Sequence, residues 1–201
     1  MMTITYPVKK GLYINMTNRC PCSCTFCLRQ HGDSVYVSDP LWLEREPSVK
    51  EVTDSIDSWN LNDFDEIVFC GYGEPTERLD DLLLVAKHIK DNYDIKIRIN
   101  TNGLSDLIHN KKTAPMLKGL IDTVSISLNA TNAEDYNKVV RPKFGIISYE
   151  AMKSFTKDCT NYVPNVIMTV VDVVTGKEEQ NLAKEICDSL GATLRIRPYE
   201  E

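Results

Sequence analysis

Residues 11–27 read Gly-Leu-Tyr-Ile-Asn-Met-Thr-Asn-Arg-Cys-Pro-Cys-Ser-Cys-Thr-Phe-Cys, and this stretch joins a candidate β-strand directly to a group of cysteines. Along Leu12–Thr17 every second residue is apolar, which is typical of a strand with one buried face. The segment from Cys20 to Cys27 then holds four of the seven cysteines in the 201-residue chain. A secreted disulfide framework would spread its cysteines out, so this clustering indicates metal or redox chemistry.

The same strand pattern recurs along the chain and alternates with amphipathic helical stretches, as in repeated β-then-α units. Further strands are expected at Glu66–Gly71, Ile95–Thr101, Thr123–Asn129, Val166–Val173 and Thr193–Tyr199. No repeat or linker interrupts the series, so we expect one domain over residues 1–201. The pattern predicts a parallel sheet curled into part of a barrel, with an open doubly wound sheet as the main alternative.

Several expected strands have one polar face, and two of these faces are rich in cations. The cationic residues are Lys96, Arg98, Arg195 and Arg197. If helices cover the apolar faces, the polar faces line a concave ligand cavity. An antiparallel sheet with one solvent-exposed face would give the same alternation. Cations in a low-dielectric cavity require anions, so we expect an anionic substrate held by Arg195 and Arg197. Alternatively, Lys96 and Arg195 only pair with structural acids.

Composition limits the classes of function. The net charge of −6 and the sequence pI near 5.2 make nonspecific nucleic-acid binding unlikely. The first residues contain no apolar segment of signal-peptide length, and no later apolar run is long enough to span a bilayer. A cytoplasmic protein without membrane contact is therefore the expectation.

The cysteine spacing suggests which metal is bound. Cys20, Cys24 and Cys27 follow C-x3-C-x2-C, and three thiolates on an iron–sulfur cubane leave one iron open for another molecule. The alternative is a four-cysteine zinc site that also uses Cys22, although zinc sites generally use two well-separated cysteine pairs. The scattered cysteines, which are Cys70, Cys159 and Cys187, are expected to be structural.

The C-x3-C-x2-C spacing, with Phe26 before the last cysteine, resembles the signature of the radical S-adenosylmethionine (SAM) superfamily. Three further segments look like motifs of that family and follow in the family order. These are Gly71-Tyr-Gly-Glu-Pro-Thr76, similar to GGEP; Asn100-Thr-Asn-Gly103, similar to xTNG; and Ser127-Leu-Asn-Ala130, similar to SLD. Each ends an expected strand, which is the end where barrel folds build their active sites. Tyr72 and Asn129 depart from the Gly and Asp of the family pattern.

The resemblance implies a partial (β/α)6 TIM-like barrel that binds one [4Fe–4S] cluster and SAM. The implied cluster ligands are Cys20, Cys24 and Cys27, and the implied SAM contacts are Phe26, Gly73, Glu74, Asn100, Asn102, Ser127, Asn129 and Arg141. In the family an external one-electron donor such as flavodoxin or ferredoxin reduces the cluster. SAM is then cleaved to a 5′-deoxyadenosyl radical, which abstracts hydrogen from a substrate, here an unidentified small molecule or nucleotide.

Over residues 11–201 the chain is most similar to the TatD-associated radical SAM family, whose reaction the sequence does not identify. Three other functions stay open at this point. The chain could be an activase that makes a glycyl radical on a partner protein. It also resembles the deazaguanine-forming synthases in size, without their N-terminal substrate signature. A non-catalytic iron–sulfur or zinc module in a radical SAM-like fold is the third.

Overall fold

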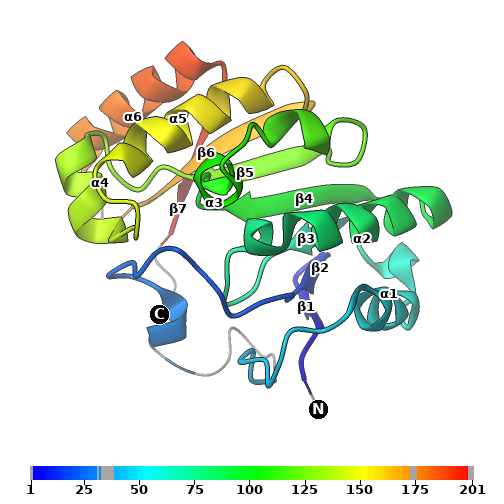
Figure 1. Cartoon of the computed structure of the whole chain (residues 1–201). Helices are drawn as coiled ribbons and strands as arrows, with labels where there is room; N and C mark the ends of the chain where they lie inside the picture. Colours follow the sequence, from blue (N-terminus) through cyan, green and yellow to red (C-terminus); the bar gives the residue numbers. More distant parts are fainter. Residues whose placement is uncertain (1, 31, 33–38, 173–175, 199–201) are drawn as a thin grey trace.

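A single sheet with strand order β1-β2-β3-β4-β5-β6-β7 runs through the chain in the computed structural model, which describes residues 2–30, 32, 39–172 and 176–198 (Figure 1). The strands are β1 (Thr5–Val8), β2 (Gly11–Ile14), β3 (Glu66–Phe69), β4 (Lys96–Thr101), β5 (Thr123–Ser127), β6 (Asn165–Val171) and β7 (Thr193–Arg197). β1 pairs antiparallel with β2, and every later pair is parallel. The parallel part, β2 to β7, confirms the predicted partial (β/α)6 barrel.

Helices follow the parallel strands and lie on one side of the sheet (Figure 1). They are α1 (Val49–Asp57), α2 (Leu79–Asn92), α3 (Ser105–His109), α4 (Ala133–Val140), α5 (Ile147–Cys159) and α6 (Lys177–Leu190). Short 3-10 turns occur at η1 (Leu28–Gln30), η2 (Leu61–Asp63), η3 (Pro75–Arg78) and η4 (Ala114–Leu117). None of the described helices has both the length and the apolar composition needed to cross a bilayer.

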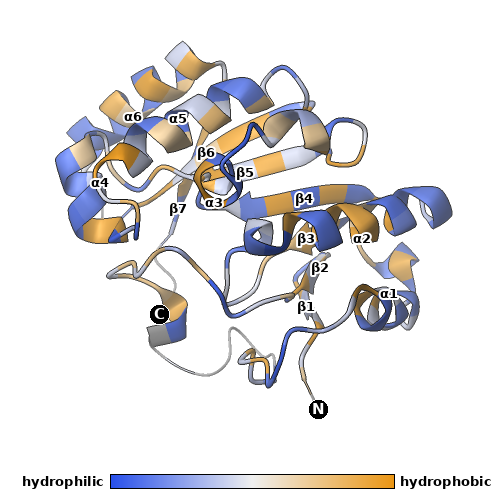
Figure 2. Ribbon diagram, in the orientation of Figure 1, coloured by the Kyte–Doolittle hydropathy of each residue, from blue (hydrophilic) through white to orange (hydrophobic). Residues whose placement is uncertain are grey.

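The hydrophobic core lies between the helices and the outer face of the sheet. It includes Leu12, Ile14, Ile67, Phe69, Ile97, Ile99, Val124, Ile126, Val166, Met168 and Val170, all from strands. Hydrophobic and hydrophilic residues alternate along β4 and β5 (Figure 2), so the residues between those core positions face the concave side. This arrangement gives the barrel an apolar outer face and a polar inner face.

Several strand ends differ from the predicted ones. β3, β5, β6 and β7 end at Phe69, Ser127, Val171 and Arg197, and the predicted ends at Val173 and Tyr199 lie outside the described residues. β2 ends at Ile14 and not at Thr17, although the peptide N–H of Asn15 still donates to Ile4 O at 2.8 Å. β1 was not predicted, since four residues that include Pro7 carry too weak an alternation.

Two leucines of α2 provide a matched test of this core. Leu82 has no exposed surface, whereas Leu84 is 56% exposed. We expect Leu82→Ala to lower the free energy of unfolding by about 2–5 kcal/mol, because it removes buried methyl groups and leaves a cavity. Leu84→Ala should change it by less than about 0.5 kcal/mol. Urea denaturation measures both; equal losses in the two variants would contradict this packing.

Candidate functional site

The cysteine loop, defined as residues 18–27, follows β2 and is attached to the end of α4. The N–H of Ser23 donates to Val140 O at 3.1 Å, and the N–H of Thr25 donates to Val139 O at 2.9 Å. Cys22 and Pro142 form an isolated antiparallel bridge. Because these backbone bonds join segments far apart in sequence, the loop has a fixed position at the carboxyl end of the sheet.

The four thiols of the loop differ in exposure. Cys22 is 3% exposed, whereas Cys20, Cys24 and Cys27 are half-buried. A hydrogen bond from the Cys22 thiol lowers the pKa of both Cys20 and Cys24, and the same two bonds raise the pKa of Cys22. Burial is the main cause that raises the pKa of Cys27. The Cys22 thiol therefore lies within hydrogen-bonding reach of both Cys20 and Cys24.

Arg29 is a residue of this site that sequence reasoning missed. Its guanidinium donates to Cys22 O at 3.2 Å and to Asn18 O at 3.4 Å, so it ties the start and the middle of the loop to the segment that follows it. Its positive charge also lowers the pKa of Cys20, Cys24 and Cys27, after larger causes in each case. A basic residue two positions after the last clustered cysteine was the available signal.

The geometry of the thiols does not resemble a single-ion site. In the part of the chain that the structure describes, no three Cys, His, Asp or Glu side chains are placed to hold one metal ion. The ligands of a cubane cluster each bind a different iron, so they do not converge on one ion.

Phe26 is half-buried directly before Cys27, whose N–H donates to Cys24 O at 3.2 Å.

The segment after β3 packs its backbone against the cysteine loop. A Cβ on Gly73 would lie 2.2 Å from Thr17 O and 2.6 Å from Arg19 O, so only glycine fits at this position. The N–H of Glu74 donates to Arg19 O at 2.8 Å. Tyr72 is accommodated on the concave side, where its hydroxyl donates to Gly32 O at 2.8 Å.

The Glu74 carboxylate is buried and joins this segment to the end of β4. Its Oε1 accepts from Thr76 N at 3.1 Å, Thr76 Oγ1 at 2.7 Å and Thr101 Oγ1 at 2.7 Å, and its Oε2 accepts from Asn102 N at 2.7 Å. Burial raises the pKa of Glu74, while these four hydrogen bonds favour the charged form. Oε2 retains capacity for a further donor.

Asn102, Asn100 and Ser127 lie at the ends of β4 and β5. Asn102 Nδ2 is 4.0 Å from Cys20 Sγ and 3.7 Å from Cys22 Sγ, so it touches the cysteine loop. Asn100 Oδ1 accepts from Arg98 Nη1 at 2.7 Å. Ser127 is the last residue of β5 and is half-buried.

Asn129 and Arg141 both have left-handed backbone conformations, with φ of 61° and 49°. Asn129 is 4% exposed, and its Oδ1 has no hydrogen-bond partner among the described residues. A buried amide oxygen without a hydrogen bond is energetically unfavourable, so a donor from a ligand would stabilise it. Arg141 is exposed at the C-cap of α4, and its backbone oxygen lies 3.3 Å from Ser23 N.

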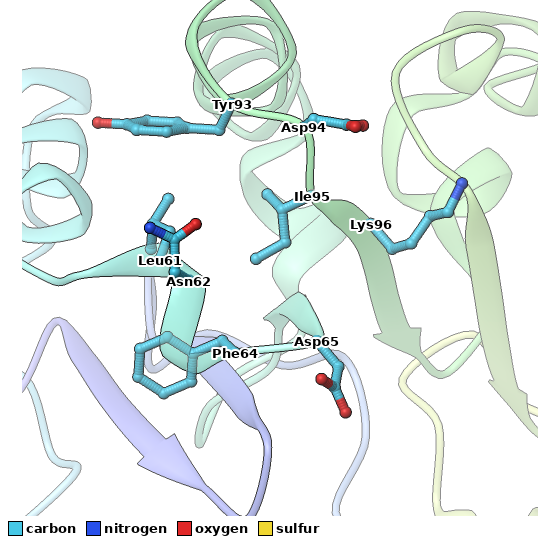
Figure 3. Close-up of a pocket in the computed structure, with 8 residues that line it drawn as sticks. All are labelled: Leu61, Asn62, Phe64, Asp65, Tyr93, Asp94, Ile95 and Lys96. Carbon is cyan, nitrogen blue, oxygen red and sulfur yellow. The ribbon is translucent and has the colours of Figure 1, made fainter.

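Lys96 does not belong to the predicted cation group, and its position agrees with the alternative that it only pairs with a structural acid. Lys96 begins β4 at the opposite end of the sheet, where its side chain is 77% exposed and 3.9 Å from Asp122. It lines a pocket with Asp65, Tyr93 and Asp94 there (Figure 3). The error arose because residues on one strand face can lie at opposite ends of the strand.

Arg98 faces the concave side, but its charge is neutralised. Its Nη2 and Nε donate to Glu66 at 2.5 and 2.9 Å, and its Nη2 lies 3.4 Å from Tyr13 Oη. Burial lowers the pKa of Arg98, but the hydrogen bonds and charge of Glu66 outweigh it and raise the pKa. Arg98 therefore holds β3 and β4 together and leaves no positive charge for a ligand.

Arg195 and Arg197 pair with Thr169 and Val171 on β6, and share their concave face. Arg195 is exposed, whereas Arg197 is half-buried and its Nε has no hydrogen-bond partner among the described residues.

The three scattered cysteines differ in their surroundings. Cys159 and Cys187 are buried within the hydrophobic core, as predicted. Cys70 is half-buried near Asn100 and lies outside that core.

Comparison with known proteins agrees with these strand-end motifs. The family model described as the radical SAM superfamily matches residues 14–186. A probable dual-specificity RNA methyltransferase RlmN from Prochlorococcus marinus is 26% identical over 78% of this chain and 44% of its own length. A GTP 3′,8-cyclase from Lactiplantibacillus plantarum is 27% identical over 64% of this chain and 36% of its own length. The chain thus spans less than half the length of either relative.

Solved structures share the fold at low sequence identity. A radical SAM methyltransferase from Sphaerobacter thermophilus superposes with a TM-score of 0.59 and 14% identity, covering 96% of this chain and 68% of that protein. The FeFe-hydrogenase maturase HydG from Carboxydothermus hydrogenoformans gives a TM-score of 0.60 and 16% identity, covering 95% and 44%. Because the family model covers most of the sequence, the chain belongs to the radical SAM superfamily, whose members are enzymes that use a [4Fe–4S] cluster and SAM.

Proposed function

We propose that this chain is a radical SAM enzyme that acts on an anionic small-molecule or nucleotide substrate and belongs to the TatD-associated family. The subfamily part rests on the sequence resemblance. When bound, the cluster and SAM would supply a 5′-deoxyadenosyl radical that abstracts hydrogen from the substrate. The chain's own residues hold these groups, position the substrate and exclude water. The electron would come from an external donor such as flavodoxin or ferredoxin.

We assign the cluster to Cys20, Cys24 and Cys27, and the exposure of the thiols supports this choice. These three side chains are half-buried, whereas Cys22 is 3% exposed and is held in its backbone bridge to Pro142. Thiolates are the ligands that iron–sulfur clusters require, and the charge of Arg29 favours that form. The donor set of the loop therefore fits a cluster with one open iron.

The first prediction separates Cys22 from the ligands. After anaerobic reconstitution, Cys22→Ser should keep iron and sulfide contents near those of the wild type, because serine can still occupy the buried site. Cys24→Ser should lose most of the cluster, since one of three ligands is gone. Iron, sulfide and absorbance measurements test this; equal loss in the two variants would show that Cys22 is a ligand.

We propose that SAM lies across the ends of β3, β4 and β5. Gly73 lets the backbone after β3 pack closely against Thr17 and Arg19, and the Oδ1 of Asn129, which has no partner among the described residues, is available to a ligand hydroxyl group. Glu74 Oε2 can accept one more bond, which suits an ammonium group. Arg141, exposed beside the cysteine loop, is suited to the carboxylate of SAM. Phe26, Asn100, Asn102 and Ser127 complete the proposed contacts.

The second prediction compares Glu74→Gln with Arg141→Gln. Both should weaken SAM binding to the reconstituted protein. Glu74→Gln should also lower the free energy of unfolding by about 1–3 kcal/mol, because an amide NH2 would face buried donors. Arg141→Gln should leave unfolding unchanged because Arg141 is exposed. Calorimetry with SAM and urea denaturation provide the two readouts; unchanged SAM affinity in Arg141→Gln would refute its assignment.

The Nε of Arg197, which has no hydrogen-bond partner among the described residues, is the observation that carries the proposal of an anionic substrate. Arg98, the other cation deep on the concave face, is paired with Glu66, so its charge is already balanced. A buried guanidinium nitrogen without an acceptor is costly, and a carboxylate or phosphate would satisfy it in two places. Arg195, two residues earlier on the same face, would contact the same anion from the open edge.

The third prediction uses inorganic phosphate as the probe and Lys96 as the control. Arg197→Gln should weaken phosphate binding about tenfold, whereas Lys96→Gln, which alters a cation at the other end of the sheet, should not. Dithionite-driven release of 5′-deoxyadenosine without substrate should persist in both variants. If Arg197→Gln binds phosphate as the wild type does, or if metabolite screening yields a neutral substrate, the anion proposal fails.

A further inference from the structure

Tyr136 on α4 is a buried tyrosine that no part of the proposed mechanism uses. It has no exposed surface, and its hydroxyl has no hydrogen-bond partner in the described ranges of the chain. Its neighbour Tyr149, with a ring centroid 5.6 Å away, donates its own hydroxyl to Thr131 O at 2.8 Å. Phenylalanine would fill the same core space as Tyr136 without a buried polar atom, so the hydroxyl calls for a partner.

The position of Tyr136 indicates where that partner lies. Val140 follows one helical turn later on the same face of α4, and its backbone oxygen receives the N–H of Ser23 from the cysteine loop. Cys22 is held beside this end of α4 by its bridge to Pro142. The tyrosine therefore lies one helical turn from the point where α4 meets the loop that would hold the iron–sulfur cluster.

Thiols and one carboxyl group surround the hydroxyl. Burial is the largest cause that raises the pKa of Tyr136, followed by the charges of Cys22, Cys24, Glu74 and Cys20 in that order. Both causes keep the proton on the phenol oxygen. Tyr136 thus offers a hydrogen-bond donor, and not an anion, to a region rich in sulfur.

We propose that the Tyr136 hydroxyl donates a hydrogen bond to a sulfur atom of the cysteine-bound cluster, either a ligand thiolate or a cluster sulfide. This inference rests on the proposed function, because it requires the cluster. Reduction adds negative charge to the cluster, and a donor directed at its sulfur stabilises that added charge. The hydrogen bond would raise the reduction potential and make electron transfer from the external donor easier.

The test compares Tyr136→Phe with Tyr149→Phe in the reconstituted holoprotein. Tyr136→Phe should keep the iron and sulfide contents but lower the reduction potential of the cluster by about 59 mV. That shift is a tenfold change in the equilibrium constant of a one-electron couple. Pulsed EPR in D2O should detect an exchangeable deuteron near the reduced wild-type cluster and lose that signal in Tyr136→Phe. Tyr149→Phe, which removes a neighbouring hydroxyl with a different partner, should behave as the wild type in both measurements.

The outcomes separate this inference from the proposed function. If wild-type protein assembles no cluster, the proposed function itself fails, and the role of Tyr136 fails with it. If the cluster assembles but Tyr136→Phe has the wild-type potential and deuteron signal, only the tyrosine assignment is overturned. A shift of equal size in Tyr149→Phe would also overturn it, because the effect would then come from core packing.

Discussion

The buried Glu74 carboxylate is the interaction on which the geometry of the site depends. It accepts hydrogen bonds from Thr76 beside it and from Thr101 and Asn102 at the end of β4. Its own backbone N–H is bonded to Arg19 of the cysteine loop. One residue therefore fixes the relative positions of the β3 segment, the β4 end and the loop. A charged group is suited to this because a carboxylate accepts several hydrogen bonds at once.

The two faces of the sheet perform different tasks. The outer face binds the helices through apolar side chains, which supplies most of the favourable free energy of burial. The inner face is free to carry polar groups, and most of its charge is internally balanced, as in the Arg98–Glu66 pair. Arg197 and Asn129 are the departures that matter, since each has a buried polar atom without a partner in the described structure. These unmet groups mark where ligand atoms are needed.

The cysteine loop combines a rigid frame with accessible sulfur. Backbone bonds to Val139 and Val140 hold the loop on α4, and Arg29 bonds to Asn18 and Cys22 within it. Cys22, the buried cysteine, is paired in the bridge to Pro142. The remaining three thiols are left half-buried. A fixed backbone limits the movement of the ligands, which is the condition for holding one cluster in one orientation.

The parallel architecture and the placement of the motifs at strand ends could be predicted from the chain alone, because period-two alternation and chain order are local properties. The clustering of the cysteines could be read there too. Which polar groups meet became visible in the folded protein. Lys96 and Arg98 share a strand face in the sequence, yet one lies at the far rim and the other pairs with Glu66. Likewise, the environment of Tyr136 depends on how α4 packs beneath the loop. Such contacts join residues distant in the chain, and their distances are set by sheet register and closure, which local patterns do not encode.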